Sequence, residues 1–410
     1  MHLWPTMRIR DSFKIAYLKK LEWNLHRMNN EKKQKSQETS NSKQQRLLDD
    51  GDDNSTNQQQ PVKTSKVVLI CREILMLVTC CYCCFCCGAN EQSPFGTLSP
   101  TEFYAKHQVT HSSEYITNSG GFKLFTQWWA PLPPTKTIGC VAVVHGFTSE
   151  SSWFLQLTSI LFAKNGFSVC AMDHRGHGFS DGIDNLMYHI PDINPVVEDC
   201  MQYFKTFREN HAPDLPAFLY SESLGGAIAL YITLRQKGAW DGLILNGAMC
   251  GISAKIKPPW PLEHILSVVA AVVPTWRVVP TRGSLLEVSL KEEWKAKLAL
   301  ASPKRVAMRP RAATAVELIR VCKELQGRFE EVDVPLLVVH GGDDIVCDPA
   351  CAKELFERAA STDKTLKIYP GMWHLLVGEP EENVNLVFGD MVEWLENRAR
   401  RGGVANDGEA

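Results

Sequence analysis

The sequence predicts an α/β fold with a mostly parallel central sheet covered by helices on both faces. Two observations favour this fold. From about residue 100 onward, short runs rich in β-branched residues alternate with longer segments of helical character. These short runs are apolar at successive positions, which is typical of strands buried on both faces. Strands of this kind, separated by helices, form parallel sheets with helices on each side.

Composition limits the classes of protein to consider. The 410 residues are 44% hydrophobic and 22% charged, which is ordinary for a globular protein. The net charge of -2 gives no support for a nucleic-acid partner. Half of the 14 cysteines lie between Cys71 and Cys87, and the others are scattered through apolar runs. Because no apolar signal segment begins the chain, we expect reduced thiols in a cytoplasmic protein.

Two N-terminal segments stand apart from the α/β pattern. Residues 1–66 are predicted to be a disordered polar tail, because they lack the apolar surface that would offset the entropy of ordering. Residues 67–88, "VVLICREILMLVTCCYCCFCCG", are apolar and near the length of a membrane span, but an Arg-Glu pair interrupts them. Their cluster Cys80–Cys87 favours an S-acylated membrane anchor over a zinc site. An apolar leader without function stays open as the alternative.

The predicted strands follow the apolar runs in order. They occupy residues 123–131, 137–147, 166–178, 216–222, 241–248, 334–342 and 365–371. Helices are predicted over residues 221–238 and 348–360. The first is expected to end at Gly238, and the second has Asp348 at its N-cap with proline after it.

One segment, at about residues 250–311, breaks the alternation of strands and helices. It is rich in proline, carries tryptophans such as Trp260 and Trp276, and has an apolar stripe without the character of a strand. We expect an inserted helical lid here. Its apolar side chains either join the core or face an apolar ligand, and the sequence leaves both open. The α/β region is expected to span residues 100–400, with a disordered tail at 401–410.

The stretch "SESLGG", residues 221–226, joins a predicted strand to a predicted helix. A tight turn at such a junction exposes one side chain and requires small residues two positions before and after it. Ser223 meets this requirement, with Ser221 before it and Gly225 after it. A nucleophile at Ser221 would instead place the bulky Leu219 at a small position. Ser223 is therefore the candidate nucleophile.

A serine nucleophile needs a base, and the base needs a carboxylate that fixes its tautomer. "VVHGGDDIVCDP" places two adjacent acids, Asp343 and Asp344, directly after a predicted strand, and "YPGMWHLL" places His374 after the last one. The developing oxyanion needs two fixed donors. The backbone N–H of Leu224, at the start of the helix, and that of Phe147, in "VVHGFTSE", are the candidates.

Five motifs in this order carry a family resemblance: "HGF" followed by Trp153, "DHRGHGFSDG", "SESLGG", "HGGDD" and "YPGMWH". Together they resemble the plant monoacylglycerol lipase-like α/β-hydrolases, whose domain is often labelled serine aminopeptidase-like. The resemblance implies the α/β-hydrolase fold and a Ser-His-Asp acyl-enzyme mechanism without metal or organic cofactor. It also selects Asp344 over Asp343 as the acid. The family usually has glycine where this chain has Ser221.

The resemblance leaves the substrate open. A small lipid ester, cleaved by a monoacylglycerol lipase or lysophospholipase at a membrane, is favoured by the apolar insertion and the Cys-rich segment. A caffeoylshikimate-type phenolic ester is the alternative from the same family. A non-catalytic hydrolase-fold receptor is the alternative from another class. The histidines of "DHRGHG", His174 and His177, are interpreted as part of a structural loop beside the site rather than as metal ligands.

Overall fold

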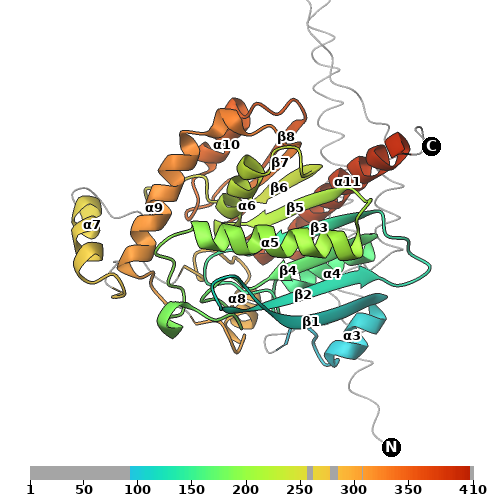
Figure 1. Cartoon of the computed structure of the whole chain (residues 1–410), viewed down its shortest axis with the longest axis horizontal. Helices are drawn as coiled ribbons and strands as arrows, with labels where there is room; N and C mark the ends of the chain where they lie inside the picture. The colour runs from blue at the N-terminus through green and yellow to red at the C-terminus, as the bar shows by residue number, and fades with distance from the viewer. Residues whose placement is uncertain (1–92, 256–261, 278–284, 307, 407–410) are drawn as a thin grey trace, which may run out of the picture. The chain divides into compact units, whose positions relative to one another are not determined.

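The computed structural model describes residues 93–255, 262–277, 285–306 and 308–406 (Figure 1). The expected tail at 1–66 and the Cys-rich segment at 67–88 lie outside the described residues. In the described part of the chain, no helix combines the length and the apolar character needed to cross a membrane.

The centre of the fold is a sheet in which the described residues form eight strands, in the order β1-β2-β4-β3-β5-β6-β7-β8. The strands are β1 (Val109–Thr117), β2 (Lys123–Pro131), β3 (Gly139–Val144), β4 (Phe167–Met172), β5 (Ala217–Glu222), β6 (Gly242–Asn246), β7 (Leu336–Gly341) and β8 (Lys364–Tyr369). β2 runs antiparallel to both β1 and β4, and all other neighbours are parallel. The predicted α/β architecture is therefore confirmed.

All seven predicted strands are present, and β1 is an additional edge strand that the prediction missed. Its sequence, "VTHSSEYIT", has one buried residue and several exposed ones. An edge strand that faces solvent needs no continuous apolar run, so the signal that found the other strands is absent here. The presence of Val, Thr, Tyr and Ile, which favour strands, before the "NSGG" turn is the weaker signal that it does carry.

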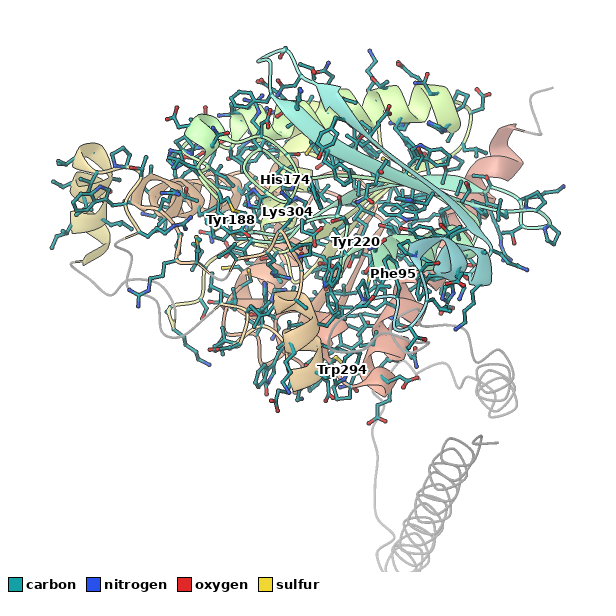
Figure 2. All side chains as sticks on the ribbon, turned by 90° about the horizontal axis from the view of Figure 1, so that it is seen from below. Phe95, His174, Tyr188, Tyr220, Trp294 and Lys304 are labelled. Atoms are coloured by element: carbon teal, nitrogen blue, oxygen red, sulfur yellow. The ribbon has the colours of Figure 1, made fainter. Side chains whose placement is uncertain are left out.

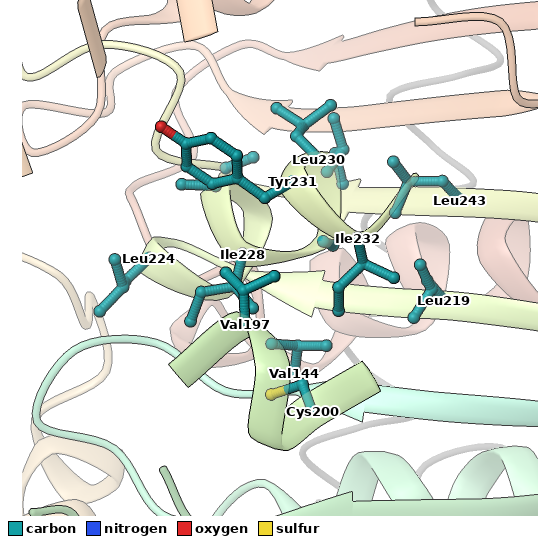
Figure 3. Packing of buried hydrophobic residues seen from close by; sticks show 14 of the residues in the cluster. Val144, Val197, Cys200, Leu219, Leu224, Ile228, Leu230, Tyr231, Ile232 and Leu243 are labelled. Carbon is teal, nitrogen blue, oxygen red and sulfur yellow. The ribbon is translucent and has the colours of Figure 1, made fainter. Parts of the chain in front are cut away.

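Helices cover both faces of the sheet (Figure 1). They are α3 (Pro100–Lys106), α4 (Gln156–Lys164), α5 (Asn194–His211), α6 (Leu224–Arg235), α7 (Leu262–Val272), α8 (Glu293–Leu300), α9 (Ala312–Gln326), α10 (Pro349–Arg358) and α11 (Glu381–Asn406). One core layer unites the sheet with α5, α6, α9 and α10, and the other unites it with α3, α4, α8 and α11. Figure 3 shows part of the first layer, in which Ile228 of α6 and Val197 of α5 pack with Leu219 of β5.

The two predicted helices are present, but α6 spans Leu224–Arg235 instead of 221–238, because β5 extends to Glu222 and the backbone of Gln236 is no longer helical. α10 begins as expected, because the Asp348 side chain accepts a hydrogen bond from the N–H of Ala350. α11, however, continues to Asn406, into the segment expected to be a disordered tail. Two glycines there weaken a helix by about 1 kcal/mol each, but no proline interrupts its backbone hydrogen bonds. Residues 407–410 lie outside the described part.

The predicted insertion lies between β6 and β7 and contains α7 and α8. Its described residues form no strand of the sheet, in agreement with the missing β character. α7 packs against α9 through a small cluster centred on Leu266 and Ala312. α8 contributes Leu298 and Ala299 to the core layer that contains α11. The two helices of the insertion are therefore attached to different parts of the fold.

Candidate active site

Ser223 lies at the sharp turn between β5 and α6. Its backbone has φ 51° and ψ -118°, a conformation that non-glycine residues rarely adopt. Gly225 is required two residues later, because a Cβ there would lie 2.2 Å from the backbone oxygen of Val144. Ser221, where the family usually has glycine, lies within β5, and its hydroxyl donates to the backbone oxygen of Ile244 at 3.1 Å. A serine therefore fits this position, with its polar group satisfied.

A chain of hydrogen bonds joins the three predicted triad residues. The Nε2 atom of His374 lies 3.0 Å from the Oγ atom of Ser223. The Nδ1 atom of the same ring lies 2.7 Å from Oδ2 of Asp344. The three side chains follow β5, β7 and β8, so they meet at the carboxyl edge of the sheet. If Nδ1 carries the proton and donates it to Asp344, Nε2 is free to accept the serine proton.

The Asp344 carboxylate is held from several directions. Its Oδ1 atom accepts from the N–H groups of Val346 and Cys347, at 2.7 and 3.0 Å. Its Oδ2 atom also lies 3.1 Å from Nε2 of His340, a buried residue of β7. Burial alone would raise the pKa of Asp344, but the charge of His374 and the hydrogen bonds from both histidines outweigh burial and lower it. The carboxyl group is therefore held ionised.

The loop that carries His374 is tied to a neighbouring buried acid and to the insertion. The N–H of Trp373 donates to Oε1 of Glu379 at 2.7 Å. From α8, the buried Lys295 donates to the backbone oxygens of Val377 and Glu379, at 2.9 and 2.6 Å. A buried ammonium group is stable only where acceptors replace its water, and these carbonyls do so. The position of the base therefore depends partly on the insertion.

The two predicted oxyanion donors flank the nucleophile. Leu224 is the first residue of α6, where backbone N–H groups have no partner within the helix. Phe147 follows Gly146, and a Cβ on Gly146 would lie 3.0 Å from Cβ of Ser223. The N–H groups of Phe147 and Leu224 have no acceptor among the described residues. Both donors are thus available beside Ser223.

Buried imidazoles support the loop that presents Phe147. The His174 N–H donates to Nε2 of His145 at 3.0 Å, so the proton of the His145 ring must lie on Nδ1, which donates to the oxygen of Gly146 at 2.8 Å. Burial lowers the pKa of His174 to about 3 and that of His177 to about 4, which keeps both rings neutral. In the described part of the chain, no group of three or more acidic, His or Cys side chains is arranged to hold a metal ion.

A cavity of about 150 Å³ opens onto the triad. Ser223 and His374 lie at its wall, together with mainly apolar side chains from both the α/β core and the insertion. Leu266, Leu285 and Leu286 are apolar residues of the insertion that line it. Other apolar residues of the insertion, among them Val268 and Trp276, are exposed instead. The insertion thus supplies both a cavity wall and an outer apolar surface.

The sequence is similar to those of a known protein family and of several characterised enzymes. Residues 135–381 match the family Hydrolase_4, described as serine aminopeptidase, S33. The chain belongs to this family. It is 35% identical to the caffeoylshikimate esterase of Arabidopsis thaliana over 75% of this chain and 92% of that protein. It is 27% identical to the human monoglyceride lipase over 71% of this chain and 93% of that protein.

Solved structures confirm the fold of this serine aminopeptidase S33 member. A soluble variant of the monoglyceride lipase of Saccharomyces cerevisiae, in complex with a substrate analogue, superimposes with a TM-score of 0.62 at 23% identity. The match covers 70% of this chain and 95% of that one. Together with the family match and the relatives, this supports assignment of the chain as a carboxylic ester hydrolase.

Sequence reasoning missed several polar residues of the site. Glu222 and Arg305 both line the cavity, and His340 contacts the acid of the triad. Glu222 lies in "SESLGG" and His340 in "HGGDD", so their proximity to the site could have been predicted from the sequence. Arg305 gave no such signal, because it lies in the irregular segment after α8, about 80 residues from the nucleophile.

Proposed function

We propose that this chain hydrolyses a small carboxylic ester through an acyl-enzyme on Ser223, with His374 as the base and Asp344 as the residue that orients it. The observation that carries the proposal is the hydrogen-bond chain from Ser223 through His374 to Asp344, with distances of 3.0 and 2.7 Å. Nucleophile and base within hydrogen-bond reach, with the base oriented by a carboxylate, are the arrangement that acyl transfer by serine requires.

The steps follow from the positions of the groups. Ser223 attacks the ester carbonyl while Nε2 of His374 takes the hydroxyl proton. The negative charge that develops on the carbonyl oxygen is stabilised by the N–H groups of Phe147 and Leu224. His374 then gives its proton to the leaving alcohol, and Ser223 remains acylated. Water, deprotonated by the same histidine, releases the acid and restores the serine.

For the substrate, we propose an ester with an apolar acyl part, as in a monoacylglycerol or a lysophospholipid. The support is the apolar lining of the cavity, to which the insertion contributes leucines in the way that a lid would. Relatives named monoglyceride lipase support the same class. We also retain the Cys-rich segment at 67–88 as the proposed membrane anchor, to be tested by hydroxylamine-sensitive acyl labelling of the full chain.

A second candidate substrate is a phenolic ester such as caffeoyl shikimate. The observation that favours it is the 35% identity with the Arabidopsis caffeoylshikimate esterase, which is higher than the 27% identity with the human monoglyceride lipase. A flat aromatic acyl group also suits an apolar cavity, so the lining alone does not separate the two candidates.

The test compares hydrolysis of 2-monoacylglycerol, lysophosphatidylcholine and caffeoyl shikimate by the wild type and by Ser223→Ala. We expect the wild type to cleave at least one of them and Ser223→Ala to cleave none. Cleavage of a lipid supports the first candidate, and cleavage of the phenolic ester alone supports the second. A wild type that cleaves no ester and does not react with a fluorophosphonate would contradict the proposal and favour a non-catalytic receptor.

A further inference from the structure

We propose that Arg305 is a specificity-determining residue that binds an anionic group, a carboxylate or a phosphate, carried by the ester substrate. This inference rests on the proposed function of the same site. Arg305 lies in the segment between α8 and α9 and lines the cavity that contains Ser223 and His374. It brings a permanent positive charge into a largely apolar pocket.

The guanidinium of Arg305 has capacity for a ligand. No described residue forms a hydrogen bond with it or lies within ion-pair distance of it. An arginine carries five N–H donors in a planar fork that suits the two oxygens of a carboxylate or phosphate. Burial lowers the pKa of Arg305, yet arginine stays charged in proteins, so its partly buried donors need an acceptor.

The backbone on both sides of Arg305 is fixed by one buried tyrosine. The hydroxyl of Tyr188 donates to the backbone oxygen of Lys304 at 3.4 Å and accepts from the N–H of Val306 at 3.0 Å. Tyr188 and Lys304 are labelled in Figure 2. The Arg305 N–H itself donates to the backbone oxygen of Ser302 at 3.2 Å. Because these bonds hold the backbone of the turn, binding of an anion by the side chain requires no further ordering of the backbone.

Two acids near Arg305 are engaged elsewhere. Glu150 accepts from the N–H and hydroxyl of Ser152 and from the hydroxyl of Ser302. Glu222 accepts from the hydroxyl of Tyr220. Burial raises the pKa of both carboxyl groups, which favours their neutral forms. Neither acid forms an ion pair with Arg305, so both leave its guanidinium donors open to a ligand.

The chemistry of the cavity then defines the substrate class. Apolar walls hold the acyl or aryl part, the triad acts on the ester, and Arg305 pairs with an anion elsewhere in the same molecule. A carboxylate on the alcohol of a phenolic ester and the phosphate of a lysophospholipid offer the same recognition chemistry. A neutral monoacylglycerol offers no such group and would leave Arg305 without a partner.

The experiment uses two pairs of substrates, each differing in one anionic group. Caffeoyl shikimate is compared with its methyl ester at the shikimate carboxylate, and lysophosphatidate with the monoacylglycerol that has the same acyl chain. kcat/KM is measured for the wild type, Arg305→Gln, Arg305→Lys and the matched control Arg309→Gln, which removes the same charge from an exposed position on the same segment. Labelling by a fluorophosphonate reports an intact nucleophile in every variant.

For at least one pair, we expect the wild type to prefer the anionic member. Arg305→Gln should lose about 10- to 100-fold of kcat/KM on that member and less than about 2-fold on its neutral partner, as expected for the loss of a charge-assisted hydrogen bond. Arg305→Lys should fall between them, and Arg309→Gln should match the wild type. The substrate pair on which Arg305→Gln loses activity shows whether the anion is the carboxylate or the phosphate.

Two results would overturn the inference while labelling of Ser223 keeps the proposed function intact. One is a wild type that shows no preference for the anionic member of either pair. The other is an equal loss on both members in Arg305→Gln, which would make Arg305 a structural residue. If the wild type is not labelled at all, the proposed function fails first and the inference fails with it.

Discussion

The carboxyl edge of the sheet and the insertion between β6 and β7 contribute to the same cavity by different physical means. At the sheet edge, short turns directly after β5, β7 and β8 carry Ser223, Asp344 and His374. β5 and β7 are buried and paired with a strand on each side, whereas β8 is the half-buried edge strand and pairs with β7. The insertion instead reaches the cavity through individual side chains, with Leu266 on α7 and others, such as Leu285 and Arg305, on irregular segments. The comparison teaches that the reacting side chains are carried by the sheet, while much of the cavity wall comes from outside it.

The insertion itself divides into two unlike halves. Around α8, Lys295 is buried and hydrogen-bonded to the loop that carries His374. Around α7, Val268, Val272 and Trp276 are 66%, 75% and 62% exposed, and the described contacts of the helix are mainly with α9. The α8 half thus acts as a support for the base, while the α7 half is an outer wall of the cavity.

The first prediction tests the sheet edge. Asp344→Asn replaces an ionised acceptor with a group that cannot stabilise the imidazolium of His374 and that favours the wrong tautomer. We expect kcat to fall roughly 1,000- to 10,000-fold with little change in KM, measured by steady-state hydrolysis of a soluble ester. Asp343→Asn is the matched control and should keep nearly full activity. Equal losses in the two variants would contradict the assignment of the acid.

The second prediction tests the support from the insertion. Lys295→Met keeps the length of the side chain but leaves the backbone oxygens of Val377 and Glu379 without their donor. We expect the free energy of unfolding to fall by about 2–3 kcal/mol and kcat to fall as the loop of His374 shifts. Chemical denaturation and initial rates measure the two effects. Lys297→Met removes an exposed charge of the same helix and should change both by little.

A Lys295→Met variant with wild-type stability and rate would show that the base is held by the sheet edge alone. The contrast between the α8 half and the α7 half of the insertion would then disappear.

The third prediction concerns Asp173, which follows β4. Burial, followed by the charge of Glu150, raises the pKa of Asp173 to about 7. An unfolded aspartate has a pKa near 3.9, so the folded protein binds more protons between about pH 4 and pH 7. The stability that protonation provides is present at low pH and is lost as pH rises through this window.

Asp173→Asn replaces the carboxyl group with an amide that does not titrate between pH 4 and pH 7. We expect the free energy of unfolding of the variant to decline less steeply from pH 4 to pH 7, with a slope that differs from the wild type by at most about 1.4 kcal/mol per pH unit. Denaturant titrations at several pH values measure it. Parallel curves for the two proteins would mean that Asp173 is ionised throughout this range.

The sequence predicted the carboxyl edge of the sheet better than it predicted the insertion between β6 and β7. Buried strands leave continuous apolar runs, and the turns after them carry small or polar residues, so both the seven strands and the segments that hold Ser223, Asp344 and His374 were readable. β1 was missed because an exposed edge strand needs no apolar run. Arg305 and Lys295 were missed because their roles depend on how α8 and its flanking segments pack against distant loops, which no local pattern encodes.

The two serines of "SESLGG", separated by Glu222, allow the most direct test of the central claim, that Ser223 is the nucleophile. The wild type, Ser223→Ala and Ser221→Gly are treated with a fluorophosphonate, digested and mapped by mass spectrometry. The account predicts an adduct on Ser223 in the wild type and in Ser221→Gly, and none in Ser223→Ala. An adduct on Ser221, or labelling that survives in Ser223→Ala, would contradict it.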